Sequence, residues 1–251
     1  MFFRRLIVRA LGVGILAGIL LSAIQVLGVS PIILAAEEFE GGATVATADA
    51  HGGHGHSHEH DHGEAWAPAD GTERTAATVL SNVFVAIGFS AVILSLMNAY
   101  QLKAGSRITA GRGVLWGLAG FFAFFLAPSL GMPPEIPGAQ AAELSQRQWW
   151  WLLTVLCTVA GFAAIVLLSS WRKVVGSILL VLPHAIGAPH LSGPMFAHTD
   201  PSAVAALTDL HRQFMLASGL TNLLFWLVLG VACAWTMARF SSARTESNAA
   251  A

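Results

Sequence analysis

The sequence predicts an all-α integral membrane protein: a polytopic bundle of five or six spanning helices with a disordered histidine-rich outer loop. Hydrophobic residues make up 55% of the 251 residues and charged residues only 11%, whereas an ordinary soluble domain has about 25% charged residues. Several apolar runs also reach the roughly 20 residues that a helix needs to cross the hydrocarbon core. Because so few charged side chains could not cover a soluble surface, the composition excludes a soluble globular protein.

Five apolar runs are predicted to span the membrane. In chain order they are residues 6–29, 76–100, 114–130, 149–170 and 214–238. The first should remain as an anchor, because it is longer than the roughly 7 to 15 apolar residues of a cleaved signal peptide. The fourth opens with Trp149, Trp150 and Trp151, which suit the headgroup level of a bilayer.

A sixth segment, residues 174–188, is apolar but short, and Pro183 and Gly187 interrupt it. It could cross the membrane tilted or as a broken helix. Short cytoplasmic loops carry an excess of Lys and Arg. If the segment crosses, ten of the thirteen basic residues fall inside, against nine if it does not. Six spans with both termini in the cytoplasm are therefore preferred.

This topology divides the chain into four regions: an N-terminal transmembrane helix (1–34), a periplasmic loop rich in His and acidic residues (35–74), a transmembrane bundle (75–240) and a cytoplasmic tail (241–251). Thirteen of the fourteen Asp and Glu then lie outside. A negative outer face would attract cations, although acidic residues also tolerate export without influencing orientation.

Two pairs of glycines, Gly14 with Gly18 and Gly113 with Gly117, are spaced four residues apart within predicted spans or at their edge. Such small-xxx-small pairs let helix backbones approach closely. They predict tight helix packing and say nothing about function.

The centre of the long loop reads HGGHGHSHEHDHGE. Neutral imidazole binds cobalt, nickel, copper and zinc, and a flexible tract can offer interchangeable sets of ligands. We expect the tract to capture a divalent metal ion, rather than to be a purification tag or a plain polar linker. Its candidate ligands are His51, His54, His56, His58, His60 and His62.

Two further outer segments carry candidate metal ligands. Glu135 lies in the proline-fixed turn GMPPEIPG, which could line an entrance or simply connect two helices. His184 and His190 each follow a proline in the broken sixth segment, and His211 lies beyond it. Ionisable groups at membrane depth are costly and tend to face a cavity or a polar partner. Hydrogen-bonded histidines at the membrane interface are the alternative.

Motifs for catalysis are missing from the sequence. No phosphate-binding G-x-x-x-x-G-K-[ST], H-E-x-x-H or G-x-S-x-G sequence occurs. Cys157 and Cys233 lie inside apolar runs, so neither a disulfide framework nor a thiolate zinc site is indicated. We expect no enzymatic activity and no cofactor, with a divalent metal ion as the transported ligand.

Several features together resemble the CbtA family of proposed cobalt transporter subunits: the basic-anchored first span, the histidine-rich outer loop, the segment FFAFFLAPSLGMPPEIPGAQAAELSQRQWWW, and LPHAIGAPH before the last span. The resemblance runs over nearly the whole chain. It implies cobalt uptake across the bacterial cytoplasmic membrane for cobalamin synthesis, beside a small one-span, histidine-bearing CbtB-like subunit. The family is usually described with five spans, whereas the charge count here favours six.

The predicted function is therefore transport of a divalent transition-metal cation, cobalt first, into the cell. The alternatives are a nickel or zinc transporter subunit, and a membrane scaffold or sensor that binds metal without conducting it. The expected partners are the one-span subunit and membrane lipids, with no nucleic acid.

Overall fold

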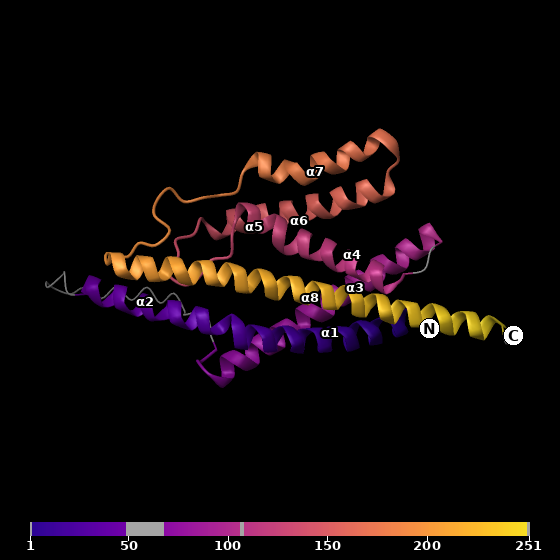
Figure 1. Cartoon of the computed structure of the whole chain (residues 1–251), viewed down its shortest axis with the longest axis horizontal. Coiled ribbons are helices and arrows are strands. Elements are labelled where there is room, and N and C mark those ends of the chain that lie inside the picture. The colour runs from indigo at the N-terminus through magenta and orange to yellow at the C-terminus, as the bar shows by residue number, and fades with distance from the viewer. Residues whose placement is uncertain (1, 49–67, 106–107, 250–251) are drawn as a thin grey trace, which may run out of the picture.

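The computed structural model describes residues 2–48, 68–105 and 108–249, and its regular elements there are helices (Figure 1). Five helical stretches are long and apolar enough to span a membrane. This confirms the predicted polytopic helical membrane fold. The elements are α1 (Phe2–Gly28), α2 (Ser30–Ala48), α3 (Thr72–Ala104), α4 (Ala110–Phe121), the π-helix η1 (Phe122–Leu126), α5 (Ala127–Gly131), α6 (Leu144–Leu167), the 3-10 turn η2 (Ser170–Arg172), α7 (Lys173–Ile186) and α8 (Pro201–Ala249).

The helices run back and forth between two ends of an elongated bundle (Figure 1). Both chain termini lie at one end, which we call the terminal end. α2, the connection between α5 and α6, and the start of α8 lie at the opposite end, which we call the loop end. Helices α1, α3 and α8 share one hydrophobic core, whose buried members include Ala10, Leu94, Met97, Leu229 and Cys233.

Glycines set the closest helix contacts. A Cβ at Gly14 or Gly18 of α1 would collide with the backbone of Ile87 or Val83 on α3. Gly113 and Gly117 of α4 lie equally close to α8, where Gly230 faces them. The packing role predicted for both pairs is thus confirmed. A further contact, between Gly161 of α6 and Gly176 of α7, comes from glycines far apart in sequence, so no spacing signal marked it.

Two prolines shape the helices near the loop end. Pro128 has no N–H to donate to the preceding turn, and just before it the N–H of Ala127 bonds the carbonyl of Phe122, five residues back. That bond belongs to a π-helical turn, which lies directly before the proline. Pro183 lies inside α7, and its carbonyl accepts hydrogen bonds from the N–H of Gly187 and from Trp150 Nε1.

The short sixth segment forms α7, which folds back along α6 toward the loop end (Figure 1). Its 14 residues make a helix of about 21 Å, shorter than the roughly 30 Å hydrocarbon core. The direction of α7 agrees with the six-pass topology. The helix ends at Gly187, whose φ is 91°.

The structure differs from the expected loops in two places. Residues 35–48 of the outer loop continue α2 as helix, since Ala36 is fully buried beside α8. Helix α8 begins at Pro201, thirteen residues before the start of the predicted span 214–238. Asp200 caps that start, with Oδ1 accepting from Ser202 N at 2.9 Å. Hydrogen bonds from Ser202 lower the pKa of the Asp200 carboxyl.

Candidate functional site

The segments that carry the candidate ligands meet at the loop end of the bundle. An antiparallel bridge joins Ala139, in the connection between α5 and α6, to Phe196, in the connection between α7 and α8. The N–H of Gln140 donates to the carbonyl of Met195 at 2.8 Å beside it. Both connections pack against α2 and α8 through a small buried core, whose members are Ala36, Ile136, Phe196 and Leu207.

Glu135 lies at the edge of a cavity of about 570 Å³ between η1, α5 and the start of α6. Its Oε2 accepts from Arg147 Nη2 of α6 at 2.7 Å. The two side chains are 30% and 32% exposed, respectively. The remaining lining is mainly apolar and includes Phe125, Pro134 and Trp151. The predicted entrance residue is thus present beside a cavity, and its carboxylate is held by a cation of the chain itself.

His211 lies on α8 one turn after Leu207, so both face the connections above the helix. The His211 side chain is only 5% exposed, and its ring meets Phe196 edge to face. Its Nδ1 is buried without a hydrogen-bond partner among the described residues.

His184 and His190 have different surroundings. His184 is half-buried on α7, and its ring meets the edge of Trp150, with centroids 5.8 Å apart. Trp150 also packs against Gly131, the first residue of the GMPPEIPG turn. His190 is exposed in the connection after α7. His198 is occupied locally, because its Nδ1 accepts from the N–H of Asp200 at 3.1 Å.

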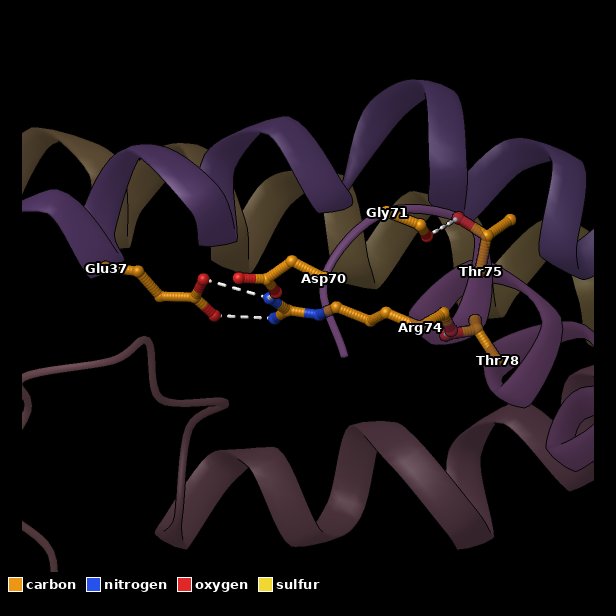
Figure 2. A network of polar contacts seen from close by, with 6 residues as sticks. All are labelled: Glu37, Asp70, Gly71, Arg74, Thr75 and Thr78. Carbon is orange, nitrogen blue, oxygen red and sulfur yellow. Dashed lines mark hydrogen bonds and ion pairs between the residues drawn. The ribbon is translucent and has the colours of Figure 1, made fainter. Parts of the chain in front are cut away.

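The histidine tract lies outside the described residues, so its six predicted ligands stay predictions. The helices on either side of it are tied together by an ion pair (Figure 2). Arg74 of α3 donates from Nη1 and Nη2 to Glu37 of α2 at 2.9 and 2.5 Å, and from Nη1 to Asp70 at 3.2 Å. The Arg74 guanidinium lowers the pKa of Glu37 below its usual value.

No group of three or more His, Cys, Asp or Glu gathers into a metal-binding cluster within residues 2–48, 68–105 and 108–249. The structure pairs Glu135 with Arg147 and His211 with Phe196, and it places His184 beside Trp150, which packs against Gly131 of the same turn. The roles of Glu135, His184, His190 and His211 as metal ligands therefore remain predictions.

Sequence reasoning missed Arg147 and Arg74, the two cations that hold these carboxylates. Local spacing would have favoured Glu143, four residues before Arg147, as the partner of this cation, whereas the structure pairs it with Glu135 across the proline turn. The pairing of Arg74 with Glu37 requires the ends of a long loop to meet, which no local pattern reveals.

Inside the bundle, several polar side chains bond to other side chains or to backbone carbonyls. Asn82 of α3 donates from Nδ2 to Gln25 Oε1 and Ser22 Oγ of α1, at 2.6 and 3.1 Å. Thr154 and Thr158 of α6 each donate to the carbonyl one turn earlier. These groups stabilise helix contacts, and their oxygens are the polar atoms available at membrane depth on α1 and α6.

The family model described as probable cobalt transporter subunit (CbtA) matches residues 3–238 of the chain. The match covers the histidine tract, the loop-end connections and the five candidate spans, the last of them to within one residue of its end. Among curated proteins and solved structures, none matches the chain.

Proposed function

Because the chain belongs to the CbtA family of probable cobalt transporter subunits, we propose that it carries a divalent transition-metal cation, cobalt first, into the cell across the bacterial cytoplasmic membrane. The observation that carries this proposal is the extent of the match, which covers the five candidate spans, the last of them to within one residue of its end. A subunit acts within a complex, and a small one-span subunit of the CbtB type is the partner we propose.

The distribution of charge supports placing the loop end outside the cell. The start of α1 and the connections α3–α4 and α6–α7 lie at the terminal end (Figure 1), and these segments, with the helix turns beside them, include the basic residues Arg4, Lys103, Arg112, Arg172 and Lys173. Acidic residues gather at the loop end, including Glu37, Asp70, Glu135, Glu143 and Asp200. Positive residues mark the cytoplasmic side of short connections, so both termini lie in the cytoplasm. The negative loop end then faces the source of metal ions and attracts them.

Capture begins at the histidine tract. It joins α2 to α3, whose ends lie at the loop end where Arg74 bonds Glu37. The ion then passes to the carboxylate of Glu135 and the imidazoles at the loop end, and from there through the bundle. Imidazole and carboxylate ligands bind nickel, copper and zinc at least as well as cobalt. Preference for cobalt therefore comes from the geometry of the site or from metal supply.

The rival function is a scaffold or sensor that presents bound metal to a partner and conducts nothing. The sequence feature that favours it is the histidine tract, which would suffice for binding without conduction. Uptake of radioactive cobalt by cells without other cobalt importers separates the two functions.

The uptake experiment compares the wild-type chain with a variant in which all six tract histidines are serine. A transporter keeps its maximal rate and loses uptake mainly at scarce cobalt, because the tract only gathers the ion. A scaffold or sensor confers no uptake at any cobalt concentration. The matched control changes Glu59→Gln and Asp61→Asn, which leaves the imidazoles in place and should alter uptake far less.

A further inference from the structure

We propose that the cavity between η1, α5 and the start of α6 binds one phospholipid with an ethanolamine headgroup. Arg147 binds the phosphate of this lipid, Glu135 binds its ammonium group, and the upper part of its acyl chains lies against the apolar lining. This inference goes beyond the proposed transport function. Its test contains no cobalt, so that either proposal can fail without the other.

The first step is the opening of the cavity. Its volume of about 570 Å³ lies in the range of ordinary ligand sites. Leu144, Trp151 and Leu152 line it, and they stay exposed although they are large and apolar. The cavity therefore opens onto an apolar surface of the bundle, and in a membrane protein such a surface meets the acyl chains of lipids.

The second step is the level of the cavity in the bilayer. Tryptophan side chains gather at the headgroup level, and Trp149 and Trp151 of α6 are both exposed. Arg147 lies one turn before Trp151, near the start of α6 at the loop end. Its guanidinium therefore lies at the level of the lipid phosphates. Leu152, beyond Trp151, lies at the level where the acyl chains begin.

The third step is the hydrogen-bonding capacity that the ion pair leaves free. Nη2 of Arg147 donates to Oε2 of Glu135 at 2.7 Å. A guanidinium has five N–H donors, and both oxygens of a carboxylate accept. The other donors of Arg147 and Oε1 of Glu135 have no hydrogen-bond partner among the described residues. About a third of each side chain is exposed, so a headgroup in the cavity can reach both.

The fourth step is the match of charge. Arginine binds phosphate through its planar fork of donors. In an ethanolamine headgroup a short linker joins that phosphate to an ammonium group, whose N–H donors suit Oε1 of Glu135. A choline headgroup has no N–H to donate, and a glycerol headgroup brings no positive charge to the carboxylate. The two opposite charges at the edge of the cavity therefore favour the ethanolamine phospholipid.

A second ion pair provides a matched control. Arg212 of α8 bonds Asp209 three residues earlier, and both side chains are more than 60% exposed. Neither residue lines the cavity. Arg212→Gln and Asp209→Asn therefore remove the same kinds of charge as Arg147→Gln and Glu135→Gln, but they leave the cavity unchanged.

The test is native mass spectrometry of the purified full-length chain in detergent, titrated with ethanolamine, choline or glycerol phospholipids that have identical acyl chains. The wild type is expected to bind the ethanolamine lipid with a dissociation constant about fivefold below that of the other two. Arg147→Gln raises the constant for all three lipids. Glu135→Gln raises it for the ethanolamine lipid and lowers it for the anionic glycerol lipid, and misfolding cannot produce these opposite changes. The two control variants leave each constant within about twofold of the wild type.

Two further variants separate the cavity from lipid bound elsewhere on the bundle. Ser129→Leu adds volume to the wall of the cavity and should weaken binding of all three lipids. Arg147→Lys keeps a cation for the phosphate, so it should recover part of the binding that Arg147→Gln loses.

The proposal is overturned if the wild type binds the three lipids equally or not at all, if Glu135→Gln keeps the preference for ethanolamine, or if Ser129→Leu leaves binding unchanged. A protein helix is the other occupant to consider. If Ser129→Leu releases a co-purified one-span partner and leaves the lipid bound, the cavity holds that helix and the proposal is wrong.

Discussion

Arg9 of α1 donates a hydrogen bond from Nη1 to the carbonyl oxygen of Thr236 on α8, at 2.8 Å. The two residues are 227 positions apart, so the beginning of the first span lies beside the last turns of the final span. A chain that begins and ends at the same end of a bundle crosses it an even number of times. Five stretches have the length of a full span, and the crossing of the shorter α7 as the sixth pass stays a prediction.

The six-pass topology predicts which residues face the outside of the cell. Ser192→Cys, in the exposed connection after α7, should react with a membrane-impermeant thiol reagent in intact cells. Ser169→Cys, in the exposed turn between α6 and α7, should react only after the membrane is opened. Native Cys157 and Cys233 are buried, so the background should be low. The reverse labelling pattern at these two positions would rule out this orientation.

The contact between α1 and α3 predicts a specific sensitivity to added volume. Gly14→Ala should destabilise the protein by about 1–3 kcal/mol, the usual range for overpacking, because the new Cβ meets the backbone of Ile87. The thermal midpoint in detergent reports the loss. Gly12→Ala is the matched control, since nothing lies within 4 Å of a Cβ there. Equal effects of the two substitutions would show that α1 does not pack as described.

The ion pair between Glu37 and Arg74 predicts a pH-dependent contribution to stability. The folded-state pKa of Glu37 is lowered by Arg74 below the usual 4.5, so folding favours the ionised carboxylate. The contribution is fully present above pH 4.5 and is lost as the pH falls through the folded-state pKa. Glu37→Gln should cost about 0.5 kcal/mol at pH 7 and nothing in strong acid. A difference in unfolding midpoint that stays constant from pH 7 to pH 3 would argue against this pair.

Capture by the histidine tract predicts a second pH effect, which concerns cobalt uptake instead of stability. Imidazole binds metal only when neutral, and its ordinary pKa is about 6.5. Uptake at scarce cobalt should therefore weaken as the external pH falls below about 6.5, while uptake at saturating cobalt changes less. The variant with six serines should lose this difference. If wild-type uptake at scarce cobalt were the same at pH 5 and pH 7, imidazole capture would be excluded.

The sequence was sufficient for the membrane fold because apolar length and glycine spacing are local properties. The helical start of the outer loop was missed, because residues 35–48 are rich in Glu, Gly and Ala and owe their order to packing of Ala36 beside α8. The early start of α8 did carry a signal. Asp200 is a capping residue type, and Pro201 after it stands at the first helical position.

The candidate site was predicted only in part for a related physical reason. Glu135 and His211 stand out as polar residues near apolar runs, but their surroundings depend on two connections that meet each other, α2 and α8 at the loop end. Contacts between segments that are distant in the sequence cannot be predicted from its hydrophobic periodicity. The same holds for Arg147, whose partner lies across a proline turn.

The most direct test of the central claim is movement of the metal itself. The purified chain, together with its one-span partner, is placed in lipid vesicles that contain a cobalt chelator, and radioactive cobalt is added outside. The proposed function predicts that cobalt accumulates inside, and that it does so more slowly at limiting cobalt when the six tract histidines are serine. Cobalt that binds to the vesicles but never reaches the chelator would contradict transport and establish a metal-binding scaffold.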